Sequence, residues 1–92
     1  MSIQWLFDVI ESRRQKPSDQ SYTSSLFAEG LPRIAQKVGE EGTEVVVAAL
    51  AQDDQRLIEE VADLTYHTLV LLAARGLQIQ DILAELEKRH RR

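Results

Sequence analysis

The chain contains no cysteine and almost no signal for β-structure. Without cysteine, disulfide bonds, thiolate metal ligands and cysteine nucleophiles are excluded, so the metal ligands to look for are oxygen atoms. The one run of β-branched residues, 45–47, lies inside a helical pattern, and neither an Asn-Gly nor an Asp-Gly turn occurs. These absences point to an all-α protein.

Long apolar runs and an excess of positive charge are also missing. No stretch approaches the roughly 18 to 20 apolar residues of a membrane span, and the N-terminus lacks the basic start and cleavage region of a signal peptide. The formal net charge of −4 argues against a general nucleic-acid binder. The basic ending, residues 88–92, fits the C-terminus of a helix. We therefore expect a cytoplasmic protein that binds neither membranes nor nucleic acid.

What the sequence does contain is apolar residues at helical spacing. The pattern predicts helices over about 2–15 and 32–51, a third that begins at Asp53 and runs up to Gly76, and a final helix beyond that glycine. Residues 18–25, rich in Ser, Thr and Gln, predict a loop with at most one short helical turn.

These segments make a single domain over residues 1–92, an antiparallel bundle of four to five helices. A chain of this size buries only about two-thirds of its surface on folding. Wide apolar helix faces are then most easily covered by a second copy, so we expect dimerisation to complete the bundle, as a homodimer.

Two acidic clusters stand out on neighbouring helices. Glu41 and Glu44 are three residues apart on the second predicted helix, and Glu60 and Asp63 are three apart on the third, so each pair projects from one helix face. The short connection between the helices makes them antiparallel neighbours, which can bring the two pairs together. Four carboxylates would then converge.

The placement of these acids favours a metal site over a solvated surface. Glu41 and Glu60 each lie on or beside an apolar stripe. Residues 38–63 hold eight carboxylates and a single cation, Arg56, so ion pairs cannot balance the cluster within that span. Mg²⁺ prefers oxygen ligands and is commonly held by a few carboxylates together with substrate phosphates. We expect Mg²⁺.

Several neighbours of the clusters allow two interpretations. Glu40 and Glu59 either reach the metal or lie on the surface. Lys37 either pairs with the carboxylate four residues later or neutralises substrate phosphate. His67, four residues after Asp63, is better explained as a packed neutral histidine than as a ligand or general base. Gly39 and Gly42 each cost about 1 kcal/mol in a helix, which indicates a kink or the close approach of a helix or phosphate.

The motif Glu40-Glu41-x-x-Glu44, followed by Glu60-x-x-Asp63, resembles the signature of the all-α nucleotide pyrophosphohydrolases of the MazG and dimeric dUTPase superfamily. More narrowly, residues 21–49, SYTSSLFAEGLPRIAQKVGEEGTEVVVAA, are similar to the hallmark of the phosphoribosyl-ATP pyrophosphohydrolase family of histidine biosynthesis. The resemblance covers nearly the whole chain. One departure is Gly42, where the family pattern has alanine.

The resemblance implies Mg²⁺-dependent hydrolysis of 1-(5-phosphoribosyl)-ATP to phosphoribosyl-AMP and pyrophosphate. The family enzymes are homodimers, and in some organisms they are fused to the cyclohydrolase that acts next, which makes a separate phosphoribosyl-AMP cyclohydrolase a candidate partner. The residues that match the superfamily's metal-ligand positions are Glu41, Glu44, Glu60 and Asp63.

Roles for the remaining candidate residues follow from this reaction. One of Glu40, Glu41 or Glu44 would accept the proton of the attacking water, and Lys37 would stabilise phosphate charge. The residues expected to bind the substrate, besides Lys37, are Ser21, Tyr22, Thr23 and Arg33. Two other functions remain open: a housekeeping pyrophosphatase for noncanonical nucleoside triphosphates, and a non-catalytic helical dimerisation module.

Overall fold

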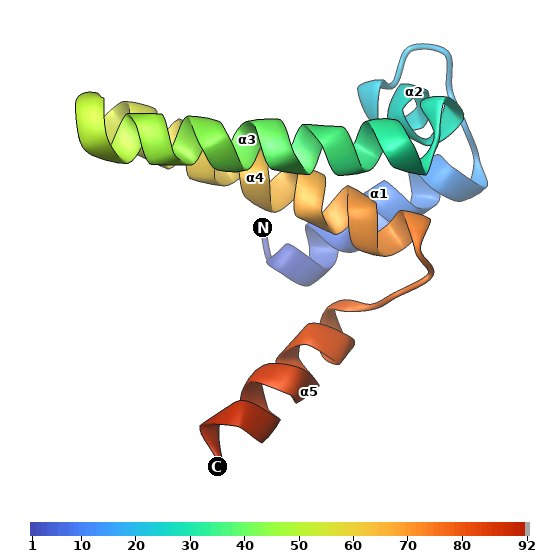
Figure 1. Ribbon diagram of the computed structural model, residues 1–92. Helices are drawn as coiled ribbons and strands as arrows, with labels where there is room; N and C mark the ends of the chain where they lie inside the picture. The colour runs from blue at the N-terminus through green and yellow to red at the C-terminus, as the bar shows by residue number, and fades with distance from the viewer. Residues whose placement is uncertain (92) are drawn as a thin grey trace.

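The computed structural model describes residues 1–91, and these residues fold into helices (Figure 1). In this part of the chain there are five helices and no strand: α1 (Ile3–Gln15), α2 (Tyr22–Glu29), α3 (Leu31–Ala51), α4 (Asp54–Ala74) and α5 (Ile79–His90). The all-α fold predicted from the sequence is confirmed. None of the described helices is long and apolar enough to cross a membrane. Arg92, the last residue of the basic ending, lies outside the described residues.

The long helices begin where the sequence places starting signals. The Ser2 hydroxyl accepts the backbone N–H of Trp5 at the start of α1 (3.0 Å), and Pro32 occupies the first turn of α3, where its missing N–H costs nothing. Asp53 caps α4 by accepting the N–H of Arg56 (2.9 Å). The observed bounds of α1, α3 and α4 therefore fall within one or two residues of the predicted ones.

The prediction of a loop over residues 18–25 is wrong for its second half, where α2 begins. The Ser21 hydroxyl accepts the backbone N–H of Ser24 (3.1 Å) and starts the helix, and Leu26 is fully buried in the core. The Ser24 hydroxyl is itself buried and accepts the N–H of Ser18 (3.0 Å). A serine-rich stretch favours turns by itself, but here the cap and the core contact override that local preference.

Glycines with positive φ separate α2 from α3 and end α4. Gly30 has φ 95° and ψ 175°, a conformation open essentially to glycine alone. Gly76 has φ 72°, and the N–H of Leu77 then returns to the carbonyl of Leu72 (2.9 Å), which closes the last turn of α4. The role of Gly76 as a helix stop is thus confirmed.

The helices α3 and α4 lie side by side as an antiparallel pair, and α1 and α2 cover one end of it (Figure 1). α5 extends away from the other helices in Figure 1. Within the described chain no residue of α5 is buried, although Ile79 touches the core and Gln80 donates a hydrogen bond to Gln4 (3.1 Å). The pair α3 and α4 therefore carries the fold, while α5 has little to pack on in a single copy.

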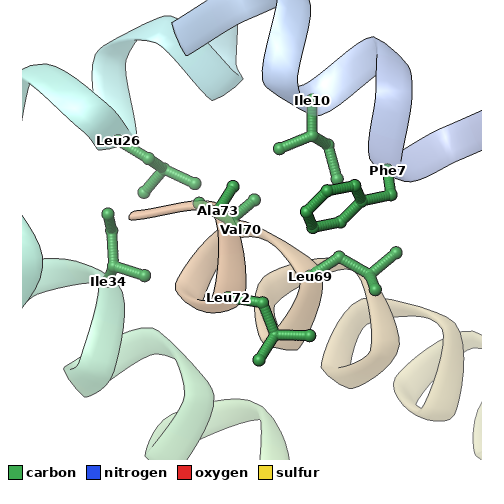
Figure 2. Packing of buried hydrophobic residues seen from close by; sticks show 8 residues of the cluster. All are labelled: Phe7, Ile10, Leu26, Ile34, Leu69, Val70, Leu72 and Ala73. Atoms are coloured by element: carbon green, nitrogen blue, oxygen red, sulfur yellow. The ribbon is translucent and has the colours of Figure 1, made fainter. Parts of the chain in front are cut away.

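The hydrophobic core lies where α1 and α2 meet the first turns of α3 and the last turns of α4 (Figure 2). We call this region the packed end. Its buried residues are Phe7, Ile10, Leu26, Ile34, Leu69, Val70, Leu72 and Ala73. The opposite end, residues 41–63, is the hairpin end, and its exposed apolar side chains include Val46, Val47, Leu50, Ile58 and Val61. The packed end therefore contains the core, whereas the hairpin end leaves a row of apolar side chains exposed.

Candidate metal centre

Three carboxylates of the hairpin end converge between α3 and α4. Oxygen atoms of Glu41, Glu60 and Asp63 all lie within 4.8 Å of one another. Glu41 and Glu60 are only 6 % and 5 % exposed, while Asp63 is open to solvent at the edge of the group. The helical spacing and the antiparallel packing thus bring together carboxylates from both helices, as the sequence pattern predicts.

Each buried carboxylate is held at one oxygen by a cation four residues earlier on its own helix. The Lys37 ammonium lies 3.3 Å from Oε1 of Glu41, and the Arg56 guanidinium donates to Oε1 of Glu60 (2.7 Å). The second oxygen, Oε2, of each carboxylate is buried and has no hydrogen-bond partner among the described residues. Two such orphaned oxygens are costly, because a buried negative group normally has each acceptor satisfied.

A divalent cation fits the two free oxygens. Both belong to carboxylates, which are the hard donors that Mg²⁺ prefers, and the exposed carboxylate of Asp63 leaves room for water and phosphate ligands. The Lys37 and Arg56 contacts fix each carboxylate by its other oxygen, as the partners of metal ligands commonly do.

Glu44, the fourth predicted ligand, is not in the converging group. Its side chain is exposed and lines a cavity of about 230 Å³ together with Arg56 and Glu60, and with Val47 and Gln52. The carboxylate is thus next to the cluster without being part of it. Glu44 and Arg56, the only Lys or Arg among residues 38–63, line the same cavity.

Glu40 is exposed and is held away from the cluster by its neighbours on α3. It accepts a hydrogen bond from Gln36 (2.8 Å) and pairs with Lys37 (3.5 Å) and Arg33 (3.8 Å). The hydrogen bond from Gln36, with the two cations, lowers the pKa of Glu40 below its usual value although burial acts the other way. Glu59 is likewise on the surface, bound to Arg56 (2.8 Å).

Lys37 bridges the buried and the exposed acids of α3. Burial by itself would lower the pKa of Lys37, but its hydrogen bond to Glu41, the nearby Tyr22 phenol and the charges of Glu41 and Glu40 together raise it. The ammonium therefore stays charged at neutral pH and is available to a phosphate group.

The predicted substrate-binding segment lies against α4. The Tyr22 hydroxyl is 3.1 Å from Nε2 of His67, and the hydroxyl groups of Thr23 and Tyr66 are in contact. The Ser21 hydroxyl is used as the cap of α2. His67 is buried, as predicted, but its ring bonds the backbone carbonyl of Asp63 (2.7 Å) and not the carboxylate.

Sequence reasoning missed Arg56 and Tyr66 as site residues. A signal for Arg56 was present, because it precedes Glu60 by four residues as Lys37 precedes Glu41. Tyr66 packs against the core, its hydroxyl group contacts that of Thr23, and burial raises its pKa above the ordinary value. No local sequence pattern predicts the contact between Tyr66 and Thr23, because the two residues are far apart in sequence.

The glycines of α3 are not explained by packing within one chain. A β-carbon built on Gly39 or Gly42 would meet no atom within 4 Å in the described part of the chain. No helix among residues 1–91 therefore approaches these glycines closely, and a phosphate group or a second copy is left as the predicted neighbour.

The largest cavity described does not coincide with the acidic cluster. It has a volume of about 430 Å³ and lies at the packed end, where Phe27, Ile34 and Ala74 are among its lining residues. No carboxylate lines it. The hairpin end is therefore the candidate functional region because of the chemistry of its donor atoms and not because of the size of a cavity.

The sequence of this chain is similar to those of known proteins. Residues 4–90 match the family model described as phosphoribosyl-ATP pyrophosphohydrolase. A phosphoribosyl-ATP pyrophosphatase from Clostridium botulinum is 49 % identical over 87 residues, which cover 95 % of this chain and 79 % of the relative. One from Pyrobaculum calidifontis is 52 % identical over 84 residues, 91 % of this chain and 89 % of the relative. A histidine biosynthesis bifunctional protein from Xylella fastidiosa is 54 % identical over 83 residues, 90 % of this chain but 40 % of the relative.

Proposed function

The chain belongs to the phosphoribosyl-ATP pyrophosphohydrolase family, and we propose that Glu41, Glu60 and Asp63 hold the Mg²⁺ with which it acts. The activity is the hydrolysis of phosphoribosyl-ATP to phosphoribosyl-AMP and pyrophosphate in histidine biosynthesis. The observation that carries the metal proposal is the pair of buried, unpartnered Oε2 atoms of Glu41 and Glu60. They have the right chemistry for Mg²⁺ and nothing else in the described chain to bind.

The residues around the cluster divide the work of the reaction. Mg²⁺, when bound, would neutralise charge on the triphosphate and lower the pKa of a water molecule. Lys37 and Arg56 hold the Oε1 atoms, which leaves the Oε2 atoms available to a metal ion. Glu44, exposed in the adjacent cavity, serves either as a further ligand or as the base that accepts the proton of the attacking water.

Two other acids of α3 are weaker candidates for the base. Glu41 needs its free oxygen for the metal, and Glu40 is engaged by Gln36 and two cations. The lowered pKa of Glu40 also makes it a weaker proton acceptor than an unperturbed carboxylate. Among Glu40, Glu41 and Glu44, the last is therefore our choice.

The substrate would lie along the edge shared by α2 and α3. Lys37 and Arg33 supply positive charge for phosphate groups. Both form ion pairs with the exposed carboxylate of Glu40, and a substrate phosphate could take the place of that carboxylate. Tyr22 and Thr23 lie at the start of α2, where they contact His67 and Tyr66 of α4, and Ser21 caps that helix.

A homodimer would bury the apolar side chains of α5, which packs little against the rest of its own chain. An isolated helix as short as α5 is marginal in water, so its apolar side chains, Ile82, Leu83 and Leu86, need a partner surface. The groove between α1, α4 and α5 is also apolar, with Ile3, Leu64 and Leu72 among its lining residues. We propose that a second copy covers both surfaces.

Two further proposals concern the setting of the enzyme. A bifunctional relative contains this domain in a chain more than twice as long, which supports contact with a separate phosphoribosyl-AMP cyclohydrolase. The substrate is a highly charged nucleotide, which does not cross membranes unaided, so the cytoplasm is the expected compartment.

The test is pyrophosphate release from phosphoribosyl-ATP, with Mg²⁺ or EDTA, alongside a panel of ordinary and noncanonical nucleoside triphosphates. Mg²⁺-dependent release from phosphoribosyl-ATP, much reduced in Glu44→Gln, is the expected result. Full release in EDTA would refute the metal proposal. Pyrophosphate release only from the other triphosphates would refute phosphoribosyl-ATP as the substrate and indicate a housekeeping pyrophosphatase. If no compound released pyrophosphate, a non-catalytic dimerisation module would be favoured.

A further inference from the structure

The His67 ring links the first turn of α2 to the backbone of Asp63. Its Nδ1 lies 2.7 Å from the carbonyl oxygen of Asp63, and because a carbonyl only accepts, Nδ1 carries the proton and donates it. The ring is buried between α2 and α4. In the neutral ring Nε2 then has a lone pair, so the Tyr22 hydroxyl, 3.1 Å away, donates to it.

This hydrogen bond determines what Tyr22 can offer to a ligand. A phenol has a single O–H group, and Tyr22 uses it to donate the hydrogen bond to His67. The Tyr22 oxygen can therefore only accept further hydrogen bonds. Tyr22 is 53 % exposed, so its side chain is open to a ligand. Tyr22 is thus suited to accept a hydrogen bond from a ligand and not to donate one.

The geometry is fixed by packing as well as by the hydrogen bond. The rings of Tyr66 and His67 meet edge to face with centroids 5.0 Å apart, and Tyr22 stacks on Tyr66 at 6.3 Å. α2 otherwise packs mainly against α1 and α3. The polar contacts of Tyr22 and Thr23 with α4 therefore orient the start of α2 toward the candidate metal ligands.

We propose that His67 is a positioning residue that makes Tyr22 a pure hydrogen-bond acceptor, and that Tyr22 binds a donor group of the substrate's nucleoside part. The donor is a ribose hydroxyl or an amino group. Phosphate oxygens carry no proton to donate near neutral pH, so Tyr22 does not bind them. The inference rests on the proposed function, because it takes the acidic cluster as the place where the phosphates lie.

Substitutions of His67 can separate the roles of its two nitrogen atoms. Asparagine keeps a donor near Nδ1 but has no group at Nε2, whereas glutamine keeps an acceptor near Nε2. We expect Tyr22→Phe and His67→Asn each to raise KM for phosphoribosyl-ATP about tenfold, because each removes the oriented acceptor. The change in kcat should stay within about twofold. The KM of the double variant Tyr22→Phe/His67→Asn should be no higher than that of either single variant. His67→Gln should leave KM close to the wild-type value.

Binding measurements identify the group that Tyr22 contacts. Calorimetry with Mg²⁺ present would compare phosphoribosyl-AMP, ribose 5-phosphate and inorganic pyrophosphate on the wild type and on Tyr22→Phe. We expect phosphoribosyl-AMP to bind about tenfold more weakly to the variant and pyrophosphate to bind equally well. If ribose 5-phosphate also weakens, the donor is a hydroxyl, and if it does not, the donor is an amino group.

Tyr66→Phe is the matched control, because it removes the other tyrosine hydroxyl that joins α2 to α4. Our proposal predicts a smaller rise in KM for Tyr66→Phe than for Tyr22→Phe. Equal effects of the two would mean that the contacts only dock α2 and would overturn the proposal. So would equal effects of His67→Asn and His67→Gln, or a parallel loss of pyrophosphate binding. A wild-type enzyme that does not hydrolyse phosphoribosyl-ATP would instead refute the proposed function.

Discussion

The packed end and the hairpin end of this molecule are built on the same two helices and differ in what completes them. At the packed end, α1 and α2 cover α3 and α4, and the largest buried side chains are all apolar. At the hairpin end two buried carboxylates each lack a partner at one oxygen among residues 1–91, and apolar side chains face solvent. One end is held together by apolar packing within the chain, whereas the other depends on a metal ion to balance its buried carboxylates.

The largest effect should come from a cavity at the packed end. Phe7 is 1 % exposed, so Phe7→Ala should lower the free energy of unfolding by about 3–5 kcal/mol. Because no metal lies nearby, the loss measured by urea unfolding should be the same with and without Mg²⁺. The exposed neighbour Asp8→Ala is the control. A loss for Phe7→Ala that Mg²⁺ largely reverses would contradict the division into two ends.

Next in size is the loss of a ligand at the hairpin end. Glu60→Gln removes a buried carboxylate of the cluster and should lower kcat/KM by at least about 100-fold, since the metal supplies several kcal/mol of charge stabilisation. It should also abolish any rise of Tm on addition of Mg²⁺. Glu59→Gln, which removes an exposed acid bound to the same Arg56, serves as the control. Equal losses in the two variants would argue against the assigned ligand.

A smaller effect is expected at the proposed dimer surface. Leu83 lies on the exposed apolar face of α5, and burial of a leucine contributes about 1.5–3 kcal/mol. Leu83→Asp should therefore weaken the dimer at least tenfold, as measured by sedimentation equilibrium. Ala84→Asp, on the opposite face of the same helix, should leave the dimer intact. Weakening by Ala84→Asp alone would place the interface elsewhere.

The smallest effect concerns a glycine of α3. A β-carbon at Gly42 would meet no atom within 4 Å in the described residues, so Gly42→Ala should stabilise the protein by about 1 kcal/mol. Gly76→Ala should have the opposite sign, because φ is 72° there. Thermal unfolding measures both. A destabilising Gly42→Ala would mean that a second copy approaches α3 closely at this point.

Much of this fold could be predicted because its signals are local. Asp53 caps α4 and Gly76 ends it through contacts with residues only a few positions away. The pairing of Glu41 with Glu60 and Asp63 followed from helical spacing and a short connection. These features depend on the period of the helix and on turn chemistry, which a sequence displays directly.

The features that sequence reasoning missed depend on contacts between distant residues. α2 forms where serines favoured a loop, because Leu26 enters the core and Tyr22 meets His67 of α4. Glu44 shares a helix face with Glu41 on a wheel, yet it falls outside the converging group. A wheel gives the direction of a side chain but not its distance from a second helix.

The most direct test of the central claim is the position of a bound metal ion. Crystals grown with Mn²⁺ in place of Mg²⁺ would reveal it by anomalous diffraction. Our account predicts a peak within bonding distance of carboxylate oxygens of Glu41, Glu60 and Asp63, with Lys37 and Arg56 still on the Oε1 atoms of the two glutamates. A metal bound elsewhere, or none at these carboxylates in an active enzyme, would contradict it.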